Sequence, residues 1–213
     1  MIQQGLSDIL SKGLSQLNLT QALNSSQQSS LLKYVELLNK WNKTYNLTAV
    51  RKPEQMVIRH LLDSLSICSY LRGKRVLDVG TGAGLPGIPL AIVFPEKNFT
   101  LLDSNNKKTR FVVQAASELE LTNVGVVQSR VEEFEAEALF DTIITRAYSA
   151  IGDMVAQTSH LLAPDGVFLA MKGTNPVAEI DELSSGYYIK ESHEINVPGL
   201  EEERHLLEIK STK

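Results

Sequence analysis

The chain has 213 residues, 43% of them hydrophobic, and a formal net charge of −4 at pH 7. This length accommodates one full-sized domain with a small appendage, and the apolar content is ample for a core. No apolar run is long enough to span a membrane, and the N-terminus lacks the pattern of a secretory signal. The single cysteine, Cys68, excludes an internal disulfide and fits a reducing compartment, so we expect a cytoplasmic protein.

The charges are unevenly distributed along the chain. Residues 33–75 hold nine lysines and arginines against three acids, whereas residues 179–208 hold nine acids against Lys190 and Arg204. A basic front and an acidic back suit a protein that meets a polyanion on one side only. Solvated helix faces are the alternative explanation of the same pattern.

The first seventy residues have the apolar spacing of helices. Leu6, Leu10 and Leu14 recur at helical intervals, the polar segment 24–30 interrupts the pattern, and a second amphipathic series runs over 31–45. Pro53 stands in the first turn of a third helix that extends to about residue 70. We therefore expect a helical cap over residues 1–72 and a second domain over 73–213.

After residue 73 short strands alternate with helices. We expect strands at 75–79, 99–103, 124–128, 141–145, 166–171, 187–195 and 204–210, and helices at about 85–93, 106–119, 150–162 and 176–184. Alternating strands and helices predict a parallel sheet covered on both faces. The last two strands follow each other without a helix, which predicts an antiparallel hairpin at one edge. The fold class is therefore α/β and Rossmann-like, with a mostly parallel sheet of seven strands that is typical of class I methyltransferases.

A glycine-rich loop, DVGTGAGLPG over residues 78–87, directly follows the first expected strand. Glycines permit positive φ and let the backbone approach a ligand where a Cβ would clash. The loop satisfies the dinucleotide pattern G-x-G-x-x-G, and Asp103 follows about twenty residues later, as that pattern requires. A turn that only connects a strand to a helix is the simpler alternative.

The acid at the start of the loop argues against a dinucleotide. Asp78 would repel a pyrophosphate beside the helix N-terminus, whereas it suits a cationic ligand without phosphate. S-adenosylmethionine meets both conditions, because its amino group and its sulfonium are positive. Asp103 at the end of the next strand would accept hydrogen bonds from the ribose hydroxyls, and Gly82 belongs to the same cofactor loop.

The loop, with its two prolines after the glycines, resembles that of the bacterial ribosomal RNA small subunit methyltransferase G family, also called glucose-inhibited division protein B. The resemblance extends over nearly the whole chain and includes segments 41–48, 59–64, 101–104, 128–132, 145–147 and 203–205. It implies S-adenosylmethionine-dependent methylation of N7 of a single guanine, guanine 527 in standard bacterial numbering, in 16S ribosomal RNA. It also implies cofactor contacts at Gly80, Leu85, Val131, Glu132 and Arg146.

Guanine N7 as the methyl acceptor, which the resemblance implies, agrees with the absence of two catalytic motifs at the strand ends. The fourth strand does not end in the Asn/Asp-Pro-Pro-aromatic tetrapeptide of amino-group methyltransferases, and no cysteine lies at a strand end. Guanine N7 carries no proton, so no general base is required, and the enzyme has to align the reacting atoms and exclude water. We assign Arg146 the catalytic role of positioning, and we expect no metal.

The expected partner is 16S ribosomal RNA or the small ribosomal subunit. We expect the protein to be a monomer. Candidate phosphate contacts are Arg51, Lys52, Arg59, Lys74, Arg75, Lys107, Lys108 and Lys172. We expect His60 to be a satisfied helix histidine and Trp41 to belong to the core. Two other functions remain open: a methyltransferase of small molecules, which does not need the basic cap, and a non-catalytic RNA-binding module that senses the cofactor.

Overall fold

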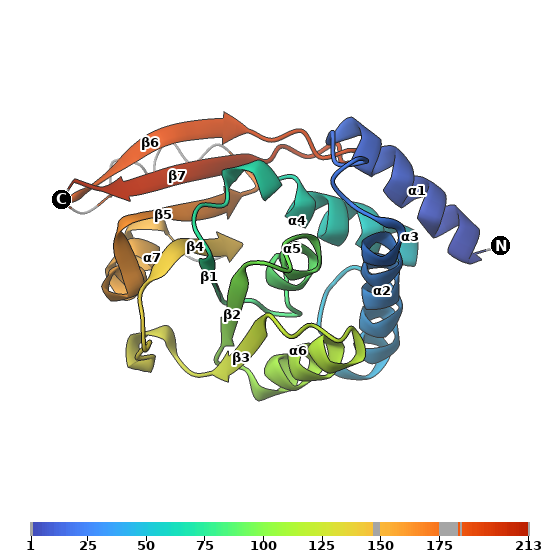
Figure 1. Ribbon diagram of the computed structural model, residues 1–213, viewed down its shortest axis with the longest axis horizontal. Coiled ribbons are helices and arrows are strands. Elements are labelled where there is room, and N and C mark those ends of the chain that lie inside the picture. The colour runs from blue at the N-terminus through green and yellow to red at the C-terminus, as the bar shows by residue number, and fades with distance from the viewer. Residues whose placement is uncertain (1, 147–149, 175–182, 184, 213) are drawn as a thin grey trace.

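Seven strands form one sheet in the order β3-β2-β1-β4-β5-β7-β6 (Figure 1). The computed structural model describes residues 2–146, 150–174, 183 and 185–212. The strands are β1 Arg75–Val79, β2 Asn98–Asp103, β3 Val124–Gln128, β4 Phe140–Arg146, β5 Leu162–Lys172, β6 Tyr187–Glu194 and β7 His205–Ser211. The first five pair in parallel, and β7 runs antiparallel to both β5 and β6. The predicted sheet with its terminal hairpin is thereby confirmed.

Two boundaries near the fourth crossover differ from the prediction. The expected helix over 150–162 is shorter, because α7 spans Ile151–Thr158 and ends in a 3₁₀ turn over Ser159–Leu161. Strand β5 begins at Leu162 instead of residue 166, since Leu162 pairs with Phe140 and the turn-like residues after it form a register irregularity. The helix expected at 176–184 lies almost entirely outside the described residues.

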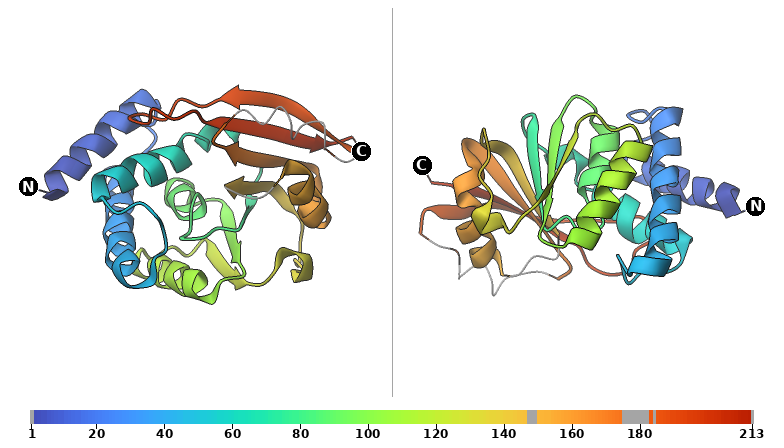
Figure 2. Two further views of the ribbon diagram at one scale, coloured as in Figure 1. Left: turned by 180° about the vertical axis from the view of Figure 1, so that it is seen from behind. Right: turned by 90° about the horizontal axis from the view of Figure 1, so that it is seen from below.

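Helices cover both faces of the sheet (Figure 2). Strand β1 alternates, so that Val76 faces the core shared with α5 Gly87–Val93, α6 Asn106–Glu118 and the N-terminal helices. Its neighbour Leu77 faces the second core, which contains Met154 and Val155 of α7. This period of two is what a strand buried on both faces requires.

The N-terminal helices begin with α1 Ile2–Gln16 and α2 Ser25–Tyr45. The segment 24–30, expected to interrupt the helical pattern, is instead the start of α2. Asn24 caps this helix by accepting a hydrogen bond from the Gln27 backbone N–H, and the Gln27 side chain accepts one from the Asn24 N–H in return. Such a capping box satisfies two otherwise free N–H groups, so a polar run becomes the first helical turns.

The third helix begins at Pro53 as predicted, but its backbone is not uniform. It consists of α3 Pro53–Met56, a π-helical stretch Val57–Leu62 and α4 Asp63–Leu65, and a separate 3₁₀ turn follows over Cys68–Tyr70. The Asp63 N–H donates to the Ile58 carbonyl, which is the i to i−5 bond of a π-helix. π-Helical turns inside α-helices often coincide with functional sites.

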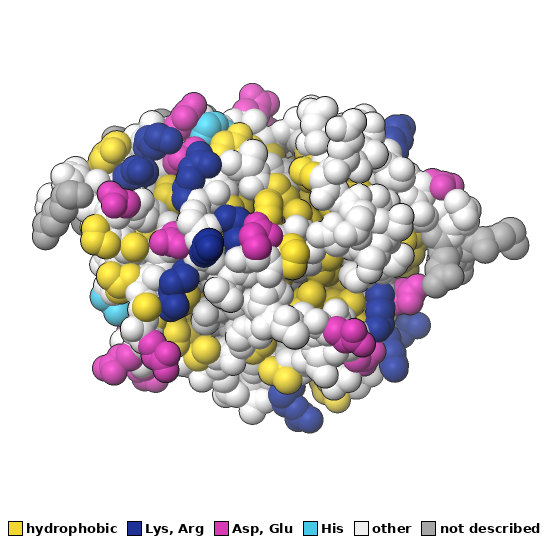
Figure 3. Space-filling model, viewed as in Figure 1, with side chains coloured by type: hydrophobic (Ala, Val, Ile, Leu, Met, Phe, Trp, Pro, Cys, Tyr) yellow, Lys and Arg dark blue, Asp and Glu magenta, His cyan; other side chains and the backbone are white. Residues whose placement is uncertain are grey.

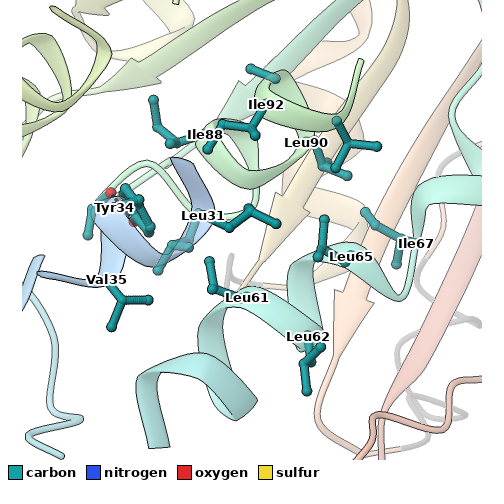
Figure 4. Packing of buried hydrophobic residues seen from close by; sticks show 14 of the residues in the cluster. Leu31, Tyr34, Val35, Leu61, Leu62, Leu65, Ile67, Ile88, Leu90 and Ile92 are labelled. Atoms are coloured by element: carbon teal, nitrogen blue, oxygen red, sulfur yellow. Dashed lines mark hydrogen bonds between the residues drawn. The ribbon is translucent and has the colours of Figure 1, made fainter. Parts of the chain in front are cut away.

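The cap and the sheet share one hydrophobic core. Figure 4 shows Leu31, Tyr34 and Val35 of α2 close to residues of the third helix and of α5. The Tyr34 hydroxyl donates to the Ala83 carbonyl in the glycine loop over 2.7 Å, so α2 braces the loop directly. Cys68 is buried as expected, and burial raises the pKa of its thiol to about 12. A division of the chain at residue 72 stays a prediction.

Candidate functional site

The glycine loop turns sharply at the carboxyl end of β1. Gly80, Gly82 and Gly84 have φ values of 69°, 61° and 87°, in the left-handed region that favours glycine. The N–H groups of Gly80 and Thr81 both donate to the Leu102 carbonyl, and the Gly82 N–H donates to Asp103 Oδ2 over 2.9 Å. The loop is therefore fastened to the end of β2 by its own backbone.

Asp78 fastens the loop from the other side. Its fully buried carboxylate accepts hydrogen bonds through Oδ2 from the Thr81 hydroxyl at 2.6 Å and from the Gly87 N–H at 2.9 Å. Its Oδ1 is buried without a hydrogen-bond partner. Burial raises the pKa of Asp78 to about 6, although the Thr81 and Gly87 hydrogen bonds oppose that shift. Asp78, which the sequence predicts to face the ligand, thus has a structural role, and one of its buried oxygens has no hydrogen-bond partner.

A first cavity of about 310 Å³ opens beside the loop, over the ends of β1, β2 and β3. It brings together four predicted cofactor residues, Gly80, Asp103, Val131 and Glu132. Asp103 is 7% exposed, and its carboxylate accepts hydrogen bonds from the Gly82 and Asn105 N–H groups. Lys108 Nζ lies 4.0 Å from Asp103 Oδ2. The cavity is also lined by Val79, Leu102, Ser104, Ser129, Arg130 and Gln157.

Three predicted cofactor residues do not line this cavity. Asp78 and Gly82 shape the loop as described, and Leu85 is buried in the core shared with the cap. A fourth, Arg146, lines a different cavity. The cofactor contacts expected at these four residues stay predictions. For Asp78, Gly82 and Leu85, such a contact would be made through the backbone of the loop.

A second cavity, of about 380 Å³, lies at the ends of β4 and β5 on the side of the cap. Four cationic side chains face it: Arg59 from the third helix, Arg146 from β4, Lys172 from β5 and Arg204 from the segment before β7. Its remaining lining residues are Val50, His60, Asp63, Met171 and Gly173. Because β1 and β4 are adjacent strands, the two cavities open at the same edge of the sheet.

A buried acid joins two of these cations. Asp63 is 2% exposed, and its Oδ2 accepts from Arg146 Nη1 and its Oδ1 from Arg204 Nε, each over 3.0 Å. The acid that pairs with Arg146 is thus neither Asp78 nor Asp103, the two acids at neighbouring strand ends. The actual partner comes from the cap and is 83 residues away in the chain.

His60 behaves as the sequence predicts. Its two ring nitrogens interact with the Arg59 carbonyl at 3.0 Å and with the Thr48 hydroxyl at 2.9 Å. Burial, with a smaller contribution from the nearby Arg146 charge, lowers the pKa of His60 to about 4. The imidazole is therefore neutral at pH 7 and lines the cavity as a polar, uncharged group.

The predicted phosphate contacts fall into separate places. Arg59 and Lys172 line the second cavity, Arg51 and Lys52 follow Val50 of its lining, and Lys107 and Lys108 lie in the first turn of α6. Lys74 and Arg75 lie at the start of β1, the opposite end of that strand from the glycine loop. The Arg75 guanidinium donates to the carbonyls of Leu139 and Ala138 and stacks on Phe140.

The two segments of opposite charge meet beside the second cavity. Arg59 Nη2 lies 2.5 Å from Glu202 Oε1, and Arg204 of the acidic segment pairs with Asp63 of the cap. Figure 3 shows lysine and arginine side chains interspersed with acidic ones over the hairpin end of the sheet. The basic and the acidic segment are therefore in direct contact beside the second cavity.

Sequence reasoning missed Asp63, Arg204 and Gln157 as cavity residues. Asp63 carried a usable signal, since it lies in segment 59–64, which belongs to the family resemblance. Arg204 lies in segment 203–205 of the same resemblance, although no role was predicted for it. Gln157 carried no signal, because only the folded chain brings the end of α7 to the sheet edge. Arg130 also lines the first cavity.

One acid–base cluster lies away from both cavities. Glu208 of β7 is buried and accepts hydrogen bonds from Lys190 Nζ and His193 Nε2, each over 3.0 Å. Among the described residues, Glu191, His193 and Glu208 also place three potential metal-ligand atoms within 4.8 Å of one another. The ammonium group of Lys190 already neutralises the buried carboxylate. Within the same residues, no helix is long and apolar enough to cross a bilayer.

Comparison with known proteins yields close relatives over almost the full length. The family model described as rRNA small subunit methyltransferase G matches residues 27–207. The chain is 53% identical to ribosomal RNA small subunit methyltransferase G of Enterobacter sp. (strain 638), over 89% of this chain and 91% of that protein. It is 49% identical to the protein of the same name from Alteromonas mediterranea, over 98% of both.

Solved structures with the same architecture are more distant in sequence. The N-methyltransferase NodS from Bradyrhizobium japonicum WM9, in complex with S-adenosyl-L-homocysteine, gives a TM-score of 0.57 at 14% identity, covering 82% of this chain and 100% of that one. The glycopeptide N-methyltransferase MtfA, also in complex with S-adenosyl-L-homocysteine, gives 0.59 at 14% identity, covering 71% and 87%. At these identities the likeness establishes the class I methyltransferase fold.

Proposed function

The chain belongs to the rRNA small subunit methyltransferase G family, and from this premise we propose that it methylates N7 of one guanine in 16S ribosomal RNA with S-adenosylmethionine. The observation that carries the proposal is the adjacency of two cavities at the carboxyl ends of β1 and β4. One is built on the glycine loop and the other is rich in cations. Ligands of open α/β sheets bind at this edge.

The first cavity, together with the glycine loop beside it, suits the cofactor in charge and in shape. Asp78 Oδ1 is buried and unpartnered beside the loop, which suits a cationic group better than a phosphate. A Cβ on Gly82 would meet nothing closer than the Gly80 carbonyl at 3.9 Å, so the backbone leaves open space there. We assign Asp103 to accept hydrogen bonds from the ribose hydroxyls and Val131 to form an apolar wall, since both residues line this cavity. When bound, S-adenosylmethionine supplies a methyl group activated by a positively charged sulfur.

The second cavity suits the RNA base and its phosphates. Arg59, Arg146, Lys172 and Arg204 supply positive charge, whereas His60, with its lowered pKa, is uncharged at pH 7. Guanine N7 has a free lone pair in the ring plane, so these residues have only to hold the base, align N7 and exclude water. Arg146, at the end of β4 beside the loop, is the residue we assign to this positioning.

The RNA surface we propose is centred on the second cavity and on the first turn of α6. It contains Arg51, Lys52, Arg59, Lys107, Lys108 and Lys172. Lys74 and Arg75 are left out, because they lie at the opposite end of β1. The target base has to leave any stack to reach the cavity, which costs least in a single-stranded loop.

We further propose a monomer without a metal that acts in the cytoplasm on the RNA or the small subunit. A single chain already contributes both cavities, which supports a monomer. Light scattering with and without substrate, and elemental analysis of the purified protein, test the two points separately.

Methyl transfer from radiolabelled cofactor to 16S RNA and to small subunits is the direct test. We expect one methyl per RNA, on a guanine, and none when that guanine is replaced by 7-deazaguanine, which lacks the lone pair. A methyl group on the deaza substrate or on an exocyclic amine contradicts N7 as the acceptor. Transfer only to small molecules favours the alternative enzyme class, and cofactor binding with no transfer at all favours a sensing module.

A further inference from the structure

A single buried carboxylate connects three distant parts of the chain beside the second cavity. Asp63 comes from the third helix, Arg146 from the end of β4, and Arg204 from the segment before β7, 141 residues away from Asp63. Both oxygens of Asp63 are used, one for each guanidinium, at 3.0 Å. The side chain of Asp63 is 3% exposed, whereas both arginine side chains are 22% exposed. The acid is therefore the inner, buried member of the cluster.

The local backbone explains how the acid reaches this place. Asp63 follows the π-helical stretch Val57–Leu62, and its N–H closes the wide turn on the Ile58 carbonyl. The Arg59 carbonyl in the same stretch accepts from Arg146 Nη1 at 3.3 Å, so the helix backbone holds this guanidinium as well. Leu61, Leu62 and Leu65 on the same helix are buried in the core. The hydrophobic packing thus anchors the helix, and Asp63 is held rigidly.

A buried carboxylate between two guanidinium groups is costly to desolvate and gives little net stability unless its geometry is good. Its benefit here is orientation, because two arginines that face one cavity repel each other when nothing lies between them. We propose that Asp63 is a positioning residue that holds Arg146 and Arg204 in the orientation needed for methyl transfer. This inference rests on the proposed function, and it assigns Asp63 a role in the reaction without contact to the cofactor or the base.

Asp63→Asn tests the proposal with a nearly isosteric change. It removes the negative charge between the arginines and keeps one oxygen as an acceptor. We expect the single-turnover methylation rate at saturating RNA to fall about a hundredfold, since misplacement of positioning groups by about 1 Å has effects of this size. Affinity for S-adenosylhomocysteine in calorimetry should change less than about threefold, because Asp63 does not line the first cavity. Asp63→Glu keeps the charge and should restore part of the rate.

Glu208→Gln is the matched control. Glu208 is also a buried carboxylate bound to two cationic partners, Lys190 and His193, and it lies outside both cavities. It should lower the melting temperature to a similar extent and leave the methylation rate unchanged. Equal losses of rate in the two variants would assign Asp63 a purely structural role and overturn the proposal.

The double variant Asp63→Asn with Arg204→Ala provides a second, independent measurement. If Asp63 acts through the arginines, the double variant should lose less rate than the product of the two single losses, because Arg204→Ala already removes one of the two contacts of Asp63. Losses that multiply contradict the proposal. If Asp63→Asn does not fold, Arg204→Lys tests the contact between Arg204 and Asp63 by changing the arginine instead. The ammonium group of lysine cannot reproduce the hydrogen bond from Arg204 Nε to Asp63 Oδ1. We expect a rate loss of about tenfold for it, and a wild-type rate overturns the proposal.

Methyl transfer by the wild-type protein distinguishes a failure of this inference from a failure of the proposed function. If the wild type transfers no methyl to RNA, the proposed function fails before any variant is measured. If the wild type is active and Asp63→Asn keeps full activity, the positioning role fails and the proposed function stands.

Discussion

The two cavities are neighbours at one edge of the sheet, but they are constructed in opposite ways. The first is made by backbone: a loop of positive-φ glycines, fastened by Asp78 and Asp103 at the ends of adjacent strands. The second is made by side chains that come from the cap, from two strand ends and from the segment before β7. The first depends on the absence of Cβ atoms, and the second depends on a balance of charge.

This difference predicts different sensitivities. Added volume should damage the first cavity and leave the second intact, because the loop is packed against fully buried residues. Altered charge should damage the second cavity without disturbing the fold of the first. Four experiments test this contrast, and they are ordered from the largest expected effect to the smallest.

Gly87→Ala should have the largest effect. A Cβ at Gly87 would clash with the buried side chain of Leu101 and stand 2.8 Å from Asp78 Oδ2. Overpacking in a core of this kind costs about 3 kcal/mol, and it would also displace the carboxylate that anchors the loop. We expect a lower unfolding free energy in urea and loss of cofactor binding. Gly125→Ala is the control, because its Cβ would meet only the Phe99 carbonyl at 3.9 Å; an equally large loss in that variant contradicts the explanation.

Asp103→Asn should weaken cofactor binding while the fold persists. The carboxylate of Asp103 accepts from the Gly82 and Asn105 N–H groups through its two oxygens. The amide of asparagine keeps only one of these oxygens and has no negative charge to offer a ribose hydroxyl. A hydrogen bond to a charged group contributes roughly 1.5–3 kcal/mol, so affinity should fall about ten- to a hundredfold. Calorimetric titration measures this directly. Unchanged affinity, or tight binding of NAD by the wild type, would exclude the cofactor assignment.

The pH dependence of cofactor binding tests Asp78. Its pKa in the folded protein is about 6, above the usual 3.8, so the free protein binds this proton more tightly than the unfolded chain does. The contribution of Asp78 to stability is therefore present below about pH 4 and is lost as the pH rises through 6. Cofactor affinity should instead fall as the pH is lowered, because protonation removes the negative charge of Asp78 near the cationic cofactor. We expect a decrease of about tenfold between pH 7 and pH 5.

Asp78→Asn should remove most of this pH dependence in both measurements. Calorimetry from pH 5 to 8 and urea unfolding over the same range give the two curves. An affinity that is flat across pH 6 in the wild type argues that Asp78 only anchors the loop.

The smallest effect concerns salt. Arg59→Gln, at the second cavity, should reduce the slope of RNA affinity against salt by about 0.7–0.9 log units, the value for one lost phosphate contact. Arg75→Gln, at the far end of β1, should leave that slope unchanged, because its guanidinium is bound to the carbonyls of Leu139 and Ala138. Filter binding at several salt concentrations distinguishes them. Equal slopes in both variants would show that RNA does not approach by the second cavity.

Local signals predicted most of the fold. The period of the apolar residues placed the strands, and the missing helix before the last strand predicted the antiparallel hairpin. The errors arose where a contact far away in the chain overrides local preference or where a cap extends a helix. Asn24 turned a polar run into the start of α2, and pairing with Phe140 drew Leu162 into β5.

By itself the sequence determined the sheet and the glycine loop, because these depend on backbone geometry within short segments and on strand ends that any parallel sheet brings together. Of the residues that line the first cavity, Asp103 followed from its place at a strand end, whereas Gly80, Val131 and Glu132 came from the family resemblance. Only the tertiary structure decided the second cavity. The pairing of Asp63 with Arg146 and Arg204 depends on the packing of the cap against the sheet and on the return of the chain before β7. Nothing in the local sequence states which of several acids will lie next to a given arginine, since the desolvation and Coulomb energies that select the pair exist only once the chain is folded.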